Sequence, residues 1–383
     1  TNANLMNCLM NLYFDNASTS FPKPEDVQKR ILEYLAHGGS YGRSAYKRVF
    51  ETSYMVEQTR NVLAKVLGVK LSENIVFTSN STTALNMLIL GFKYKYNRVI
   101  ISPLEHNAVI RPLEHLKQTK GLIVDTLPHF SDGSIDLTQL ASLDLGKYDL
   151  AIVNHASNVN GLIQPLKELK KSIGNLPLLV DASQSLGKVT LDVDELNLDF
   201  VAFTGHKGLL GPTGTGGFYA RNAELLNKTI FGGTGTNSES YLMPTSLPDG
   251  FEPGTPNVLG IYGLYGAIEG KPIVQYSHAN FLKELKELQS VKGLRVLCAA
   301  HSAMQTDVFS VIPENGRISD FAQQLNQLYG IEVRSGLHCA PLAHKTLGSM
   351  PNGSVRFSLS PFHTDSEITF LFNAIQSINE RFR

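Results

Sequence analysis

The sequence lacks the features that would tie the protein to a membrane, a nucleic acid or a structural metal. Lysine plus arginine and aspartate plus glutamate number 34 each in 383 residues, so no net charge attracts nucleic acid or an anionic membrane. No apolar run reaches the length of a membrane span, and the first lysine is Lys23, so a signal peptide's basic start is missing. The three cysteines, Cys8, Cys298 and Cys339, are too scattered for a disulfide framework or a zinc site. We therefore expect a cytoplasmic protein that binds any anion at a local site.

Two signatures of nucleotide binding are missing as well. Residues 204–217 read TGHKGLLGPTGTGG, so the glycines follow Lys207, whereas a P-loop has its glycines before the lysine. No G-x-G-x-x-G motif opens a helix after the first predicted strand. A nucleotide is therefore a weaker candidate than another phosphate-bearing ligand.

The sequence does contain an alternation of strand-like and helix-like segments. Short apolar, β-branched runs predict buried strands at 98–102, 148–157, 176–183, 198–205 and 215–221. Helical spacing of the apolar residues predicts helices between them, at 110–119 and 165–174. This alternation indicates an α/β domain with a largely parallel sheet. The stretch NLYFD, at 11–15, is also strand-like.

The pattern changes near Gly260. The segments that follow predict two helices and then two strands, at 261–270, 278–291, 307–313 and 330–341. A chain of 383 residues is also long for a single core. We therefore expect a large domain at 14–260 and a smaller α+β domain at 261–383, with residues 1–13 as a candidate addition to the small domain.

Polar residues follow the predicted strands of the large domain. Asp181 ends the strand at 176–183 with Gln184 three residues later, His106 follows the strand at 98–102, and Asn158 follows the strand at 148–157. In open α/β sheets ligands bind at the carboxyl ends of the strands. A single such Asp is as often a helix cap or a turn former, so it is the shared placement that favours a binding site.

Two further stretches have both an ordinary and a chemical interpretation. The turn of Asn80, Ser81 and Thr82 precedes an apolar helical run, so it is either a simple helix cap or an anion site made of backbone N–H groups and hydroxyls. Lys207 is either a solvated surface charge or an amine held beside a strand end, where it can lose its proton and attack a carbonyl. Together these groups suit a ligand with a phosphate, a ring nitrogen needing a carboxylate, and a carbonyl. Pyridoxal phosphate has all three.

Nine motifs, in this order along the chain, resemble those of the class V aminotransferase family: YFDNAST, TSNSTTALN, EHNAV, SNVNG, VDASQS, TGHKGLLGPTGTG, FEPGTPN, RSGLHCA and VRFSLS. Within the family, RSGLHCA resembles the Suf-type cysteine desulfurases, a group that includes selenocysteine lyases. Asn107 and Ser183 depart from that group's usual His and Ala. The resemblance implies the type I fold of pyridoxal phosphate enzymes, in which a mostly parallel seven-stranded sheet is joined to a small α+β domain, and it implies a homodimer.

The resemblance also implies roles for individual residues. Lys207 corresponds to the lysine that forms the Schiff base with the cofactor and shuttles the α-proton of the substrate. Asp181 corresponds to the partner of the ring nitrogen, His106 to the residue stacked on the ring, and Gln184 to the one near the ring hydroxyl. The phosphate would be held by Ser81, Thr82, Thr204, His206 and, from the other subunit, Thr255. The substrate carboxylate would be bound by Arg356, Asn158 and Arg334.

Cys339 would define the reaction. A cysteine in a turn is usually a small buried hydrophobe, which is our interpretation of Cys8 and Cys298. The glycine and proline around Cys339 instead predict an exposed loop, where a thiolate can act as a nucleophile. The resemblance then implies conversion of L-cysteine to L-alanine, with a persulfide left on Cys339 for an acceptor protein and for iron–sulfur cluster assembly.

Two alternatives stay open from the sequence. One is another lyase or aminotransferase of the same family, such as a selenocysteine lyase. The other is an inactive chain that binds pyridoxal phosphate and serves as a scaffold. The scaffold is disfavoured because all of the implied reactive residues are present, namely Lys207, Asp181, His106, Arg356 and Cys339.

Overall fold

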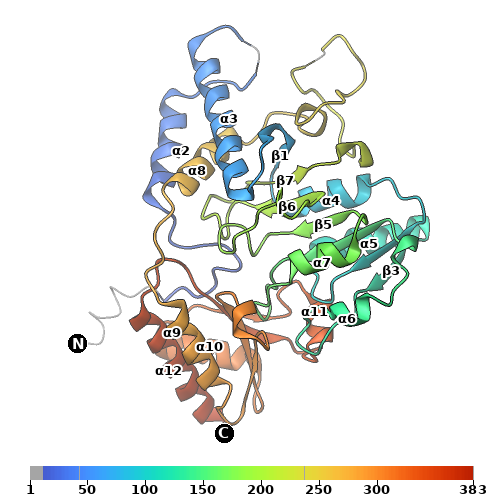
Figure 1. Cartoon of the computed structure of the whole chain (residues 1–383). Coiled ribbons are helices and arrows are strands. Elements are labelled where there is room, and N and C mark those ends of the chain that lie inside the picture. The colour runs from blue at the N-terminus through green and yellow to red at the C-terminus, as the bar shows by residue number, and fades with distance from the viewer. Residues whose placement is uncertain (1–11, 43, 237, 383) are drawn as a thin grey trace.

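A computed structural model describes residues 12–42, 44–236 and 238–382 and contains two sheets (Figure 1). The larger sheet has seven strands: β1 (Ile75–Thr78), β2 (Arg98–Ile101), β3 (Ile123–Thr126), β4 (Leu150–Asn154), β5 (Leu178–Asp181), β6 (Phe200–Thr204) and β7 (Gly216–Ala220). Their order is β1-β7-β6-β5-β4-β2-β3. Strands β3, β2, β4, β5 and β6 pair in parallel, and β7 runs antiparallel to β1 and β6. The predicted α/β fold with a mostly parallel seven-stranded sheet is confirmed.

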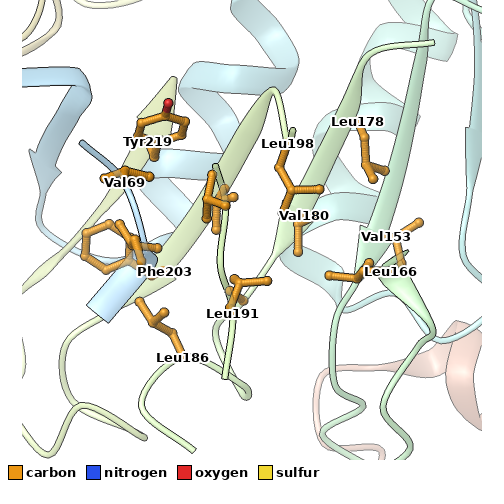
Figure 2. Close-up of a cluster of buried hydrophobic side chains, with 14 of the residues drawn as sticks. Val69, Val153, Leu166, Leu178, Val180, Leu186, Leu191, Leu198, Phe203 and Tyr219 are labelled. Carbon is orange, nitrogen blue, oxygen red and sulfur yellow. The ribbon is translucent and has the colours of Figure 1, made fainter. Parts of the chain in front are cut away.

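Both faces of the large sheet are apolar, because alternate residues of each buried strand point to opposite sides. On β4, Ala151 and Val153 belong to one core cluster, and Leu150 and Ile152 belong to the other. Figure 2 shows part of the first cluster, including Val153. Helices α3 (Lys47–Leu67) and α7 (Leu166–Ile173) cover that face, and α4 (Ser81–Gly91) and α5 (Asn107–Lys120) cover the opposite face.

The smaller sheet is antiparallel and has the order β10-β11-β9-β8. Its strands are β8 (Leu294–Leu297), β9 (Val308–Pro313), β10 (Arg334–Gly336) and β11 (Ser354–Ser358). Helices α9 (His278–Leu288), α10 (Ile318–Tyr329) and α12 (Asp365–Phe382) share its core, in the lower part of Figure 1. There the ring of Phe309 stacks on Phe357 at 5.0 Å and on Phe372 at 5.3 Å between centroids. The predicted smaller α+β unit is therefore present.

Two strand predictions need correction. Of the strand predicted at 11–15, the described residues 12–15 form none: Tyr13 and Asp15 make only isolated bridges, to Glu332 and Ser358. Phe14 is buried in the core of the small sheet, so this stretch is apolar because of tertiary packing. The predicted strand at 330–341 shortens to Arg334–Gly336, and a turn containing Cys339 and helix α11 (Pro341–Thr346) follow it.

The division of the chain at residue 260 stays a prediction. Helix α8 (Val258–Glu269) packs against α2 (Glu25–His37) and α3, and its residues Ile261 and Leu264 lie in the core of the large sheet. This packing favours a boundary after Glu269. Residues 1–11, including Cys8, lie outside the described residues.

A buried ion pair anchors the segment that leads to Thr255. The guanidinium of Arg60, which has no exposed surface, binds the carboxylate of Glu252 at 2.9 and 3.2 Å. Glu252 also accepts the backbone N–H of Phe77 at 2.6 Å, and the Phe77 ring lies 4.5 Å from the guanidinium carbon. The start of FEPGTPN is thereby fixed to β1. No helix of the described residues has the length and apolar character needed to cross a bilayer.

Candidate active site

A cavity of about 220 Å³ lies at the carboxyl ends of the central strands and receives residues from both sheets. Twelve of the thirteen predicted site residues line it: Ser81, Thr82, His106, Asn158, Asp181, Gln184, Thr204, His206, Lys207, Arg334, Cys339 and Arg356. Thr255 does not; it lines a separate cavity with Ser79 and Thr83. Residues to which the sequence assigned no role in the site also line it, among them Ser18, Ser183 and His338.

Lys207 lies in the tight turn between β6 and β7. The turn packs closely on the loop after β5, because a Cβ atom on Gly208 would lie 2.4 Å from the carbonyl oxygen of Leu186. This close approach explains the glycine that follows the lysine. Burial lowers the pKa of Lys207 to about 8; the charge of Asp181 opposes the shift and that of Arg356 adds to it. About a tenth of this amine is therefore neutral and nucleophilic at pH 7, far more than for an ordinary lysine.

Asp181 is the last residue of β5 and is almost fully buried. One of its carboxylate oxygens, Oδ1, accepts two hydrogen bonds from Ser183, one from the backbone N–H at 2.9 Å and one from the hydroxyl. The carboxylate is thereby fixed in orientation at the wall of the cavity. Ser183 had been noted only as a departure from the family pattern, and its contact with Asp181 depends on the turn after β5.

His106 caps the N-terminus of α5 and presents a neutral ring to the cavity. Its Nδ1 accepts the backbone N–H of Ala108 at 3.0 Å, so a proton on the neutral ring is at Nε2. Burial, and after it the positive charge of Lys207, lower the pKa of His106 to about 4, although the charge of Asp181 opposes the shift. A neutral aromatic ring therefore lies beside the amine and the carboxylate.

The predicted anion site is a helix N-terminus in the structure. Helix α4 begins at Ser81, and the side chain of Asn80 caps it by accepting the backbone N–H of Thr83 at 2.9 Å. The remaining N–H groups of the first turn and the hydroxyls of Ser81 and Thr82 suit an anion. A Cβ atom on Gly216 would lie 2.7 Å from the Cα of Asn80, so this glycine lets β7 pass close behind the cap.

Arg356, on β11, is held by residues of the YFDNAST motif, to which the sequence assigned no role in the site. Its Nη2 donates to Asp15 Oδ1 at 2.8 Å and to the hydroxyl of Ser18 at 2.7 Å, and its Nη1 donates to the carbonyl oxygen of Asn158 at 3.3 Å. Arg334, its neighbour across β10 and β11, also donates to Ser18, at 3.0 Å. Two guanidinium groups therefore meet at one wall of the cavity, balanced by Asp15.

Cys339 is exposed and lies in a turn whose backbone is held from two sides. His338 and Cys339 both have positive φ, 51° and 55°, which is costly for residues with a side chain. The backbone N–H of Asn107 donates to the carbonyl oxygen of Cys339 at 2.8 Å, and Asn158 Nδ2 donates to that of His338 at 2.8 Å. Asn158 therefore contacts the cysteine turn, a role that the sequence did not reveal.

Cys298 is partly buried, and burial raises the pKa of its thiol, so it lacks the exposure of Cys339. Among the described residues, no cluster of His, Cys, Asp and Glu side chains could hold a metal ion. The chemistry of the site therefore depends on the amine, the carboxylate, the arginines and the thiol described above.

The model of the aminotransferase class-V family matches residues 12–371, so the chain belongs to this family. A probable cysteine desulfurase of Methanothermobacter thermautotrophicus is 32% identical, over 96% of this chain and 94% of the relative. A probable cysteine desulfurase of Mycolicibacterium paratuberculosis is 30% identical over 96% of this chain, which spans 55% of that relative's length. Among solved structures, the apo cysteine desulfurase of Thermococcus onnurineus NA1 superposes with a TM-score of 0.88 at 28% identity, covering 99% of this chain and 96% of that one.

Proposed function

We propose that this chain is a pyridoxal phosphate-dependent cysteine desulfurase that converts L-cysteine to L-alanine and retains the sulfur as a persulfide on Cys339. One observation carries the proposal: the Lys207 amine, the Asp181 carboxylate, the Arg356 guanidinium and the exposed Cys339 thiol line one cavity. The relatives that carry the name cysteine desulfurase support it.

The residues of the cavity fit the cofactor. Within the described part of the chain, five buried polar atoms that belong to lining residues have no hydrogen-bond partner: Gln184 Oε1, Asn158 Oδ1, His206 Nδ1, His338 Nδ1 and Arg356 Nε. Unpaired buried polar atoms are costly, so their presence favours a polar ligand. Asp181 would hold the ring nitrogen, His106 would lie against the ring, and the α4 N-terminus with Thr204 and His206 would hold the phosphate. When bound, pyridoxal phosphate supplies an electron sink for the substrate's α-carbon.

The chain's own groups then divide the work. Arg356 binds the substrate carboxylate, for which a planar guanidinium is suited, and so fixes the α-carbon. Lys207, with its lowered pKa, moves the α-proton. The thiolate of Cys339 attacks the substrate sulfur, and a sulfur–sulfur bond forms as the carbon–sulfur bond breaks. The electron pair of the broken bond stays with carbon, which takes a proton and leaves as alanine.

A homodimer and a sulfur acceptor belong to the same proposal. Thr255 lies outside the cavity of its own chain and lines a separate one with Ser79 and Thr83. In a homodimer, Thr255 of one subunit would then contact the cofactor phosphate bound in the other subunit. The persulfide on Cys339 would pass to an acceptor protein and from there to iron–sulfur cluster assembly.

The decisive experiment measures alanine released from cysteine and from selenocysteine by the wild type and the Cys339→Ala variant. The variant should lose activity on cysteine by three orders of magnitude or more, roughly 4 kcal/mol of transition-state stabilisation. It should retain most of its activity on selenocysteine, because selenium leaves carbon with less help. Cys298→Ala is the matched control and should resemble the wild type. Undiminished cysteine turnover in Cys339→Ala would favour another lyase of this family.

Lys207→Ala separates the enzyme from a scaffold. Among the groups that line the cavity, no other amine is placed to react with the cofactor's carbonyl. The variant should lose both the visible absorbance of the bound cofactor and all turnover. Turnover that survives this substitution would show that the site assignment is wrong.

A further inference from the structure

A second cavity, of about 400 Å³, adjoins the active site on the outer side of Cys339. It lies between helices α4 and α5 and shares Thr82, His106, Ala108 and Cys339 with the active-site cavity. Cys339 is thus part of the wall that separates the two cavities. We call the second cavity the outer groove. A sulfur atom that Cys339 receives from the active-site side is therefore within reach of a group that enters through the outer groove.

The outer groove carries positive charge. Arg111 on α5 lines it, and no Asp or Glu is among the described residues that do so. The guanidinium of Arg111 is exposed and makes no ion pair or hydrogen bond with another described residue. His115, one helical turn further from Cys339, also lines the groove and adds a polar ring. A partner with negative charge is the one that this surface complements.

The dimensions suit an extended peptide segment. Asn107, Arg111 and His115 recur every four residues on one side of α5, and helical rise places the first and last about 12 Å apart along the helix. Three to four extended residues, at about 3.3 Å each, span that length. A single small thiol would leave most of the groove empty.

We propose that the outer groove binds an acidic segment of the sulfur acceptor, in which the accepting thiol lies next to a carboxylate that pairs with Arg111. The inference rests on the proposed desulfurase function and adds the site and the charge of the acceptor. The acceptor thiolate attacks the outer sulfur of the Cys339 persulfide, and the sulfur–sulfur bond to Cys339 breaks. Cys339 leaves as a thiolate with the electron pair, and the acceptor becomes the persulfide, so no other oxidant or reductant is needed.

The test uses the full-length holoenzyme and two synthetic, end-capped peptides with the cores Asp-Cys-Asp and Lys-Cys-Lys. The enzyme is first loaded with one equivalent of cysteine, and alanine and the Cys339 persulfide are measured. Each peptide is then added, and mass spectrometry follows the gain of one sulfur by the peptide. For each enzyme variant we take the ratio of the transfer rate to the acidic peptide over that to the basic peptide. The two thiols differ in intrinsic reactivity by the same factor with every variant, so a change in this ratio between variants reports on the enzyme.

The wild type should transfer sulfur to the acidic peptide about tenfold faster than to the basic one, a preference of the size that local charge produces. Arg111→Glu should reverse this order with the same alanine yield on loading. Lys120→Glu, which changes the same charge on the exposed end of the same helix outside the groove, should keep the wild-type ratio. Added salt should reduce the wild-type preference.

The outcomes separate the two proposals. An acidic-to-basic ratio that is equal in Arg111→Glu and the wild type overturns the groove assignment. The groove assignment is also overturned if Arg111→Glu loses as much transfer to uncharged 2-mercaptoethanol as to the acidic peptide. That result would mean a general disturbance of the cysteine turn. A wild type that forms neither alanine nor a persulfide during loading instead refutes the desulfurase function itself.

Discussion

Removing the carboxylate of Glu252 should destabilise the protein strongly, although this residue is outside the active site. Glu252→Ala removes the bidentate, largely buried counter-charge of the Arg60 guanidinium, which then keeps only the half-exposed Glu57 at 3.2 Å from its Nε. Burial alone would lower the pKa of Arg60, and it is chiefly the charge and hydrogen bonds of Glu252, with a smaller effect of Glu57, that raise it above its ordinary value. Breaking a buried pair by removing one partner typically costs about 3 to 5 kcal/mol. The backbone N–H of Phe77 also loses its acceptor, which adds about 1 kcal/mol or more in the same direction.

Because Glu57 still offsets part of the Arg60 charge, the expected loss of unfolding free energy is about 3 kcal/mol. Urea titrations followed by far-ultraviolet circular dichroism measure it. The control is Glu287→Ala, which removes an exposed partner of Lys283 at 4.0 Å and should cost about 1 kcal/mol or less. The double variant with Arg60→Met and Glu252→Leu should be more stable than Glu252→Ala, because no charge is then buried alone.

A loss of less than about 1 kcal/mol in Glu252→Ala would refute this reasoning, because the Arg60 charge would then be fully compensated by Glu57 or by water. The segment after Glu252 leads to Thr255, so the same variant should also weaken the homodimer. Light scattering at matched protein concentrations measures that second effect.

Three further outcomes are expected. In cofactor-free protein, absorbance can follow the addition of pyridoxal phosphate to Lys207. The rate of this addition should rise with pH, with a midpoint near pH 8, because only the neutral amine reacts. Asp181→Asn removes the charge that raises this pKa, so it should move the midpoint to lower pH; a wild-type midpoint above 9 would contradict the assignment. Asp15→Asn removes the carboxylate that competes with the substrate for Arg356, so it should lower the KM for cysteine. It should also lower the free energy of unfolding by about 2 kcal/mol. A raised KM would contradict this competition. Ser183→Ala leaves Asp181 with one hydrogen bond from that turn and should weaken cofactor affinity about tenfold in absorbance titrations, whereas unchanged affinity would assign Ser183 no positioning role.

The strand ends were the part of the site that the sequence could predict. Asp181 ends a run of apolar residues, and Lys207 and His106 follow two others, so the rule that parallel strands share one carboxyl edge was enough to group them. A helix start just after the polar turn of Asn80, Ser81 and Thr82 was also predictable from local sequence; the helix begins at Ser81, inside that turn, with Asn80 as its cap.

The remaining contacts depend on pairing between distant parts of the chain, which no local pattern encodes. Asp15 and Arg356 meet because residues 13–15 form bridges to the small sheet, and their apolar alternation suggested a strand instead. Asn158 was expected beside the substrate, yet its amide nitrogen binds the carbonyl oxygen of His338, which is 180 positions away in sequence. The role of Thr255 depends on a second copy and stays a prediction.

The pairing of Asp15 with Arg356 also bears on when the protein becomes reactive during its synthesis. The two residues are 341 positions apart, so a ribosome must release β11 before the arginine can meet its partner. Sulfur removal is thereby confined to chains whose early and late segments have already come together.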